Sequence, residues 1–329
     1  MTGLLSSISG QFSRSIILGS FFPAAIFILL GMVFIWPLLP ATSWLAHEVA
    51  GLNTEWQAAL LTFIVIVLTG LLYHMNIPLL RLYEGYPWQE TFPGRRDRYR
   101  RQFEAAEARA AGYRALVSQR QRLAGYRQEW ETNRRLAEGE QEWQRFVRQN
   151  FPTRPELVLP TQLGNALRKA ETYPQREYGM AAVTLWSRLI AVVKPDYATA
   201  LDNAKTSLDF MVNSSFLSGL SALLMLLLGL WYPVSLAAPT LWWPWLLPLL
   251  AFAVAAFCLY RAAVGRAAAW GSLIEGAFDL YRNDLLKALG YGDKPVSRQA
   301  ERALWDRISR QIVFGDGPEG PRASYASER

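Results

Sequence analysis

The segment RLYEGYPWQETFPGRRDRYRR, residues 81–101, begins the polar stretch that decides the fold of this chain. This basic stretch continues to residue 208, and a long apolar window lies on either side of it. No Lys or Arg occurs between Arg14 and Arg81, or between Lys205 and Arg261, so all 34 basic residues lie outside the two windows. A cation at the middle of a hydrocarbon core costs roughly 2.5–3.5 kcal/mol. The two windows are therefore predicted to lie in a membrane.

Each window is long enough for two membrane-spanning helices, because one span needs about 20 apolar residues. Prolines divide both windows, at Pro37 and Pro40 in the first and at Pro233 and Pro239 in the second. The predicted spans are residues 16–39, 58–80, 209–232 and 241–264. The predicted fold class is all-α: an integral membrane protein with four transmembrane helices and a helical cytoplasmic domain inserted between the second and third.

The distribution of charge predicts the orientation in the membrane. The loop between the first two spans carries Glu48 and Glu55 but no basic residue, and the loop between the last two carries no charge. Arginines instead follow the second span closely, beginning at Arg81. Basic residues near span ends stay on the cytoplasmic side. We therefore expect both termini and residues 81–208 in the cytoplasm, facing anionic lipid headgroups.

The cytoplasmic domain is predicted to be helical throughout. Residues 97–150 have a helical composition interrupted by glycines, which predicts two helices, and Thr161 is a natural N-cap for the next one. Residues 178–193 are predicted to form a short amphipathic helix. Pro195 is suited to the first turn of a helix that runs into the third span. The fourth span is predicted to continue toward residue 289, and Ser297 to cap a last helix.

The predicted organisation follows from these elements. Residues 1–80 form the N-terminal segment with two spans, residues 81–208 the cytoplasmic domain, and residues 209–264 the other two spans. Residues 265–314 form C-terminal cytoplasmic helices. Residues 315–329 are rich in Gly, Pro and Ser and are expected to be disordered.

The sequence lacks the common motifs of catalytic, nucleotide-binding and metal-binding sites. Walker-A, GxGxxG, GxSxG, HExxH, CxxC and EF-hand patterns do not occur. The chain has two histidines, His47 and His74, predicted on opposite sides of the membrane, and one cysteine, Cys258. We therefore predict no catalytic residue, no metal site and no cofactor. The basic charge suits a surface next to anionic lipid, and we expect no nucleic-acid partner.

Three sets of polar residues are candidate sites. The first is a mildly polar helix face, which is either a packing seam or the lining of a pore: Thr62, Thr69, Asn76, Asn213, Ser214, Ser218 and Ser221. The second is a polar cluster at the inner membrane boundary: His74, Glu84 and Asp209. The third is either an anionic-lipid contact or only a topological anchor: Arg95, Arg96, Arg98, Arg100 and Arg101.

Three segments together carry a resemblance to a known group of proteins. They are RLYEGY at 81–86, PTQLGNALR at 160–168 with Glu171 and REYG at 176–179, and FDLYRNDLLKAL at 278–289. The set resembles a family of bacterial multi-pass membrane proteins of unknown function. The resemblance implies a protein of the bacterial cytoplasmic membrane and implies no activity.

Three functional hypotheses follow. The first is a non-enzymatic scaffold, signalling or effector protein, in stress or defence, whose cytoplasmic domain recruits or senses a protein partner. The second is an oligomeric channel or pore-forming effector, in which several copies of the chain line a pore. The third is a membrane-embedded lipid enzyme that uses Glu84, His74 and Asp209.

Overall fold

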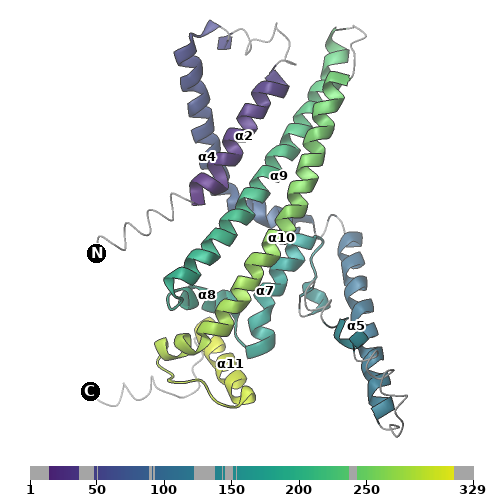
Figure 1. The fold of residues 1–329 in the computed structure, drawn as a ribbon, viewed down its shortest axis with the longest axis vertical. Helices are drawn as coiled ribbons and strands as arrows, with labels where there is room; N and C mark the ends of the chain where they lie inside the picture. Colours follow the sequence, from purple (N-terminus) through teal and green to yellow (C-terminus); the bar gives the residue numbers. More distant parts are fainter. Residues whose placement is uncertain are drawn as a thin grey trace, which may run out of the picture. The chain divides into compact units, whose positions relative to one another are not determined.

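A computed structural model describes residues 15–36, 48, 49, 51–88, 91, 93–121, 138–142, 144, 151, 152, 154–236 and 243–314. All regular structure in these residues is helical (Figure 1), which confirms the predicted all-α class. Several predicted features lie outside the described residues. They are the end of the first span at 37–39, the start of the fourth at 241 and 242, and the tail at 315–329.

The chain divides into two compact units. Unit 1 comprises Met1–Tyr83 and Asp202–Trp270, and unit 2 comprises Glu84–Leu201 and Gly271–Arg329. The sequence analysis placed the comparable boundaries after residues 80, 208 and 264. We describe each unit by itself.

Four helices are long and apolar enough to cross a membrane: Ile17–Ile35, Thr54–Glu84, Pro195–Leu230 and Leu246–Ala288. The first combines α2, Phe22–Leu30, with a π-helical turn on each side, Ile17–Phe21 and Gly31–Ile35. The others belong to α4, Thr54–Glu84, α9, Pro195–Leu236, and α10, Trp243–Ala288. Four apolar helices were predicted at these places, and the protein is thus a membrane protein by the length and composition of its helices.

The outward side chains of unit 1 are apolar. Phe63, Ile66, Leu227 and Leu250 are each more than half exposed. Large apolar side chains in continuous exposed rows suit a lipid environment, since such patches are uncommon on soluble monomers.

Hydrogen bonds between helices hold unit 1 together. Tyr83 of α4 donates to Ser215 Oγ at 3.0 Å, and Ser215 Oγ donates to the Ala256 carbonyl of α10 at 2.9 Å. Ser215 thus links three helices through one small side chain. Met225 of α9 and Phe252 of α10 pack together further along the same pair.

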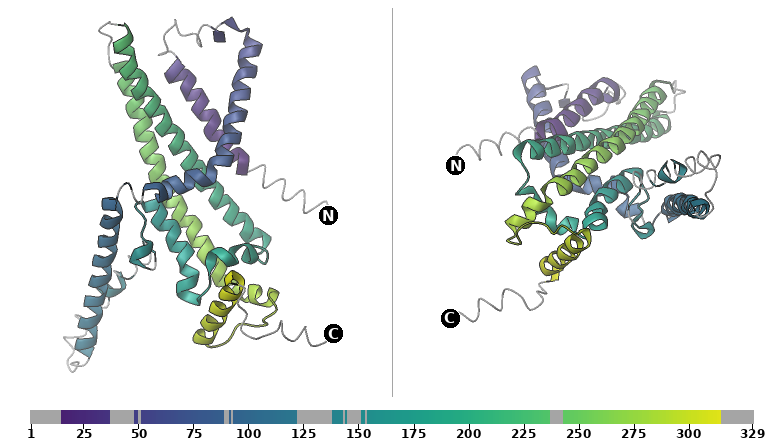
Figure 2. Two further views of the ribbon diagram at one scale, coloured as in Figure 1. Left: turned by 180° about the vertical axis from the view of Figure 1, so that it is seen from behind. Right: turned by 60° about the horizontal axis from the view of Figure 1, so that its bottom comes forward.

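Unit 2 contains α7, Gln162–Tyr178, α8, Ala182–Ile190, and α11, Arg298–Phe314, together with the N-terminal turns of α9 and the C-terminal part of α10. Figures 1 and 2 show α7, α8 and α11 gathered around that part of α10. The buried core of the unit draws on all of these helices: Leu163, Leu167, Met180, Leu185, Leu189, Leu201, Phe278, Leu285, Leu286, Trp305 and Ile308.

The local sequence explains the ends of α7. The Thr161 side chain accepts from the Gly164 amide at 3.0 Å, which confirms the predicted N-cap. Gly179 ends the helix in the left-handed conformation, with φ +76°. Its amide donates to the Gln175 carbonyl at 3.1 Å, and the Met180 amide donates to the Pro174 carbonyl at 3.2 Å, as expected of a glycine-terminated helix. The helix predicted over 178–193 therefore begins only at Ala182, because residue 178 belongs to α7.

The start of α9 and the end of α10 lie close to where they were predicted. Pro195 is the first residue of α9, which continues without a break through the third span. The fourth span likewise continues in α10 as far as Ala288. The last helix, α11, begins directly after Ser297, whose carbonyl accepts from the Glu301 amide at 2.9 Å.

A second apolar cluster in unit 2 supports α5, Pro93–Gln121. Phe103 of α5 lies against Phe151 with ring centroids 5.7 Å apart, and Val158 completes the cluster. Residues 138–142 are also helical, whereas the rest of 122–150, except residue 144, lies outside the described residues.

Candidate functional site

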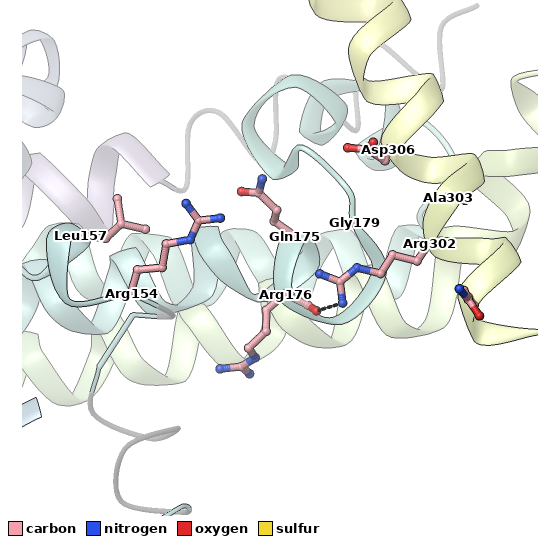
Figure 3. Close-up of a pocket in the computed structure, with 9 residues that line it drawn as sticks. Arg154, Leu157, Gln175, Arg176, Gly179, Arg302, Ala303 and Asp306 are labelled. Atoms are coloured by element: carbon pink, nitrogen blue, oxygen red, sulfur yellow. Dashed lines mark hydrogen bonds between the residues drawn. The ribbon is translucent and has the colours of Figure 1, made fainter. Parts of the chain in front are cut away.

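A polar cavity of about 680 Å³ lies in unit 2, where the chain before α7, the end of α7 and α11 come together. Residues from three stretches of the sequence line it (Figure 3): Arg154 and Leu157; Gln175, Arg176 and Gly179; Gln299, Arg302, Ala303 and Asp306. Pockets for small molecules usually enclose about 300–1,000 Å³, so its size suits a ligand of that class.

Gly179 brings α7 close to α11 at one end of this cavity. A Cβ atom at Gly179 would lie 2.9 Å from the carbonyl oxygen of Arg302, closer than carbon and oxygen normally approach. Arg302 Nη1 in turn donates to the Arg176 carbonyl at 3.0 Å (Figure 3). A few residues further along both segments, the Ala181 amide donates to Ser309 Oγ at 3.0 Å. Contacts that involve the backbone of Arg176, Gly179 and Ala181 therefore set the position of Arg302 relative to α7.

The arginines of the cavity differ in their partners. Arg176 pairs with Glu177 at 2.8 Å, and in Figure 3 its guanidinium group points away from Arg302. Asp306, the one acidic residue among the described residues of the lining, pairs with Arg310 at 2.7 Å. Among the described residues, neither Arg154 nor Arg302 has a carboxylate within ion-pair distance. The cavity thus holds two guanidinium groups that form no ion pair with a described acidic residue.

A polar network joins α7, α10 and α11 elsewhere in unit 2. Asp279 accepts from Tyr173 at 2.9 Å and from Tyr178 at 2.6 Å. Burial raises the pKa of both phenols, and their hydrogen bonds to Asp279 raise the pKa values further. Arg282 lies 4.4 Å from the centre of the Tyr178 ring and pairs with Glu301 at 2.9 Å. Because each of these groups has a partner, the network serves to hold the helices together.

Unit 1 contains the residues predicted as a packing seam or pore lining. Asn213 is fully buried and donates from Nδ2 to the Gly19 carbonyl at 2.8 Å, which joins α9 to the first helix. Ser214, Ser218 and Ser221 line a mostly apolar cavity of about 220 Å³ formed by α2, α9 and α10. This part of the face therefore lies between helices of one chain.

The α4 residues of the same predicted face lie in different environments. Thr62 is exposed and Thr69 is buried, and each hydroxyl donates to the carbonyl four residues earlier. Asn76 is half-buried, and its Oδ1 has no hydrogen-bond partner among the described residues.

The three residues predicted at the inner boundary have separate surroundings. Asp209 is buried and pairs with Lys205 at 2.6 Å. His74 is exposed, and its ring lies 5.6 Å from the Tyr73 ring. Glu84 belongs to unit 2, where its carbonyl oxygen accepts from Thr161 at 2.8 Å. The described residues contain no group of three or more His, Cys, Asp or Glu that could hold a metal ion.

The five predicted lipid-contact arginines lie on α5 and differ in their contacts. Arg96 donates to the Glu156 and Val158 carbonyls, at 2.9 and 3.3 Å, and so fastens α5 to the chain before α7. Arg100 pairs with Glu104 at 2.8 Å, and Arg101 donates to the Asp97 carbonyl at 3.3 Å. Arg95 and Arg98 are exposed.

The cavity was not predicted from the sequence. Arg154, Arg176 and Arg302 are far apart along the chain, and no periodic pattern connects them. One local signal was available: Gly179 follows a strongly amphipathic helix, which is typical of a helix end that another segment can approach closely.

Comparisons with protein-family models, with curated proteins and with solved structures found no match for this chain. The functional argument therefore rests on the residues and geometry described above.

Proposed function

We propose that this chain is a membrane-anchored signalling or scaffold protein of the bacterial cytoplasmic membrane. In this proposal the four apolar helices hold the protein in the membrane, with both termini and unit 2 in the cytoplasm, and unit 2 recruits or senses a partner. The charge asymmetry of the sequence supports the orientation, because the short outer loops lack basic residues while arginines cluster after α4.

The observation that carries the proposal is the arginine-lined cavity in unit 2. The unit has its own apolar core and a fully partnered polar network around Asp279, so its surface is presented by a well-packed scaffold. On that scaffold the cavity leaves Arg154 and Arg302 without a carboxylate partner among the described residues. Charged groups held in a concave site on a packed scaffold favour recognition.

Apolar side chains on the surface of unit 2 support a protein partner. Val183 of α8 and Val313 of α11 are 78% and 50% exposed. Exposed aliphatic side chains such as these are available for contact with a protein partner, since the centre of a protein interface is more apolar than its rim.

Site-specific photo-crosslinking tests the proposal. A photoreactive amino acid replaces Val183 in the full-length chain, which is irradiated in membranes of the organism that encodes it, and Leu250, an exposed residue of the fourth span, is the control position. We expect a discrete protein adduct from position 183 that position 250 does not give. The same adduct pattern from both positions, or no adduct from 183, would contradict the proposed role of unit 2.

A further inference from the structure

We propose that the cavity lined by Arg154 and Arg302 binds a small phosphorylated molecule of about nucleotide size. The inference rests on the proposed function, because it names the chemical class of ligand that unit 2 senses. It is drawn from the charge, size and lining of the cavity.

The charges of the cavity favour an anion. Arg176 and Asp306 are each engaged by a neighbour of opposite charge, Glu177 and Arg310. Both carboxylate oxygens of Glu177 are engaged, since Arg298 also pairs with it at 2.6 Å. The cationic character of the cavity therefore comes from Arg154 and Arg302.

The chemistry of these two arginines suits phosphate groups. Figure 3 shows the Arg154 and Arg302 side chains on either side of Gln175, with the Arg154 guanidinium group directed toward Gln175. Guanidinium groups bind phosphate oxygens through two parallel N–H donors, a geometry that an ammonium group lacks. Arg302 uses Nη1 for the Arg176 carbonyl, which orients its remaining donors.

The rest of the lining suits the organic part of such a ligand. Gln175 and Gln299 offer amide donors and acceptors, and Leu157 and Ala303 offer apolar contact. A cavity of about 680 Å³ holds more than an inorganic ion, and pockets of that size usually take small organic molecules. The combination predicts a ligand that carries one or more phosphates on a polar organic group.

Calorimetric titration tests the inference on the full-length chain in phosphatidylcholine nanodiscs. The probes are ATP, pyrophosphate and adenosine, so that the phosphate and organic parts are measured separately. We expect ATP to bind, pyrophosphate to bind more weakly, and adenosine not to bind. Affinity for ATP is expected to fall as salt increases, because the two arginines are exposed to solvent.

Three variants locate the site. Arg154→Gln and Arg302→Gln each remove one guanidinium group and are expected to weaken ATP binding about tenfold or more. Arg307→Gln removes the same charge from α11 outside the cavity lining and is expected to leave binding within about twofold of the unchanged protein. All three positions are exposed, and equal melting temperatures would exclude unfolding as the cause.

The outcomes separate this inference from the proposed function. No binding of ATP or pyrophosphate at millimolar concentration overturns the inference, as does equal binding by the Arg154→Gln and Arg302→Gln variants and the unchanged chain. If a discrete adduct still forms from position 183, the proposed function stands without this ligand. If ATP binds through the two arginines and no protein adduct forms, the ligand site stands and the protein partner does not.

Discussion

The contact between Gly179 and α11 makes the strongest prediction about stability. Substitution by Ala adds one methyl group at a position where the backbone has φ +76°. A side chain in the left-handed conformation costs roughly 1–2 kcal/mol. The same methyl group would lie 2.9 Å from the Arg302 carbonyl oxygen, where an ordinary contact needs at least 3.4 Å. Overpacking of this kind costs roughly 1–3 kcal/mol, so the expected total is about 2–5 kcal/mol.

The chain offers a matched control for the backbone part of this cost. Gly292 has the same φ, +76°, and a Cβ atom there would meet nothing within 4 Å. Gly292→Ala should therefore cost only the roughly 1–2 kcal/mol of the backbone conformation. The difference between the two variants isolates the contact between the end of α7 and α11.

Hydrogen–deuterium exchange measures both variants in the full-length protein, because it reports local opening free energies without requiring global unfolding. We expect Gly179→Ala to speed exchange of amides in the last turns of α7 and across α11. At α11 the effect should exceed that of Gly292→Ala by about fivefold or more, since the overpacking part is roughly 1–3 kcal/mol and each 1.4 kcal/mol is a factor of ten. Equal exchange of α11 in the two variants would refute the close approach of Gly179 to Arg302.

Three further predictions concern other parts of the molecule. Asn213→Leu should destabilise unit 1 by about 0.6–2 kcal/mol, because it removes a buried hydrogen bond between two apolar helices, and unfolding in mixed micelles would measure the loss. The raised pKa values of Tyr173 and Tyr178 mean that their contribution to the stability of unit 2 is complete below about pH 10 and is lost as pH rises further, because the phenols of the unfolded chain ionise first. A Tyr173→Phe/Tyr178→Phe double variant should therefore show a smaller decrease in the opening free energy of unit 2 between about pH 9 and pH 11, as measured by hydrogen–deuterium exchange. Arg96→Gln should speed amide exchange in residues 154–158, whereas Arg98→Gln should not, because only Arg96 donates to carbonyls of that segment in the described structure.

Local chemistry explains what could be predicted from the sequence. The four apolar helices follow from the absence of Lys and Arg over two long windows, which the high cost of a buried cation enforces residue by residue. The beginnings of α7 and α9 follow from Thr161 and Pro195, whose preferences act within one helical turn. In each case the signal and its structural consequence lie within the same short segment.

The site depends on tertiary contacts that leave no such local signal. Arg96 was grouped from its neighbours in sequence with an anionic-lipid contact or a topological anchor, and no sequence pattern indicated that it also donates to carbonyls about 60 residues further along. Arg154 and Arg302 come together only because η5, Pro155–Leu157, the end of α7 and α11 surround one cavity. Whether an arginine forms an ion pair likewise depends on whether the fold places an acidic side chain within reach of it.

The ion pairs in unit 2 distinguish Arg154 and Arg302, which have no carboxylate partner among the described residues, from nearby arginines that do. An exposed arginine is well hydrated, so the lack of a partner is by itself ordinary. Here, however, three nearby arginines have partners: Arg176 and Arg298 share Glu177, and Arg310 pairs with Asp306. Glu177 and Asp306 are thus already engaged, and Arg154 and Arg302 keep their positive charge at one concave place. A phosphate ligand would supply the missing negative charge there and would connect η5 to α11, which gives binding a direct route to a change in the stability of unit 2.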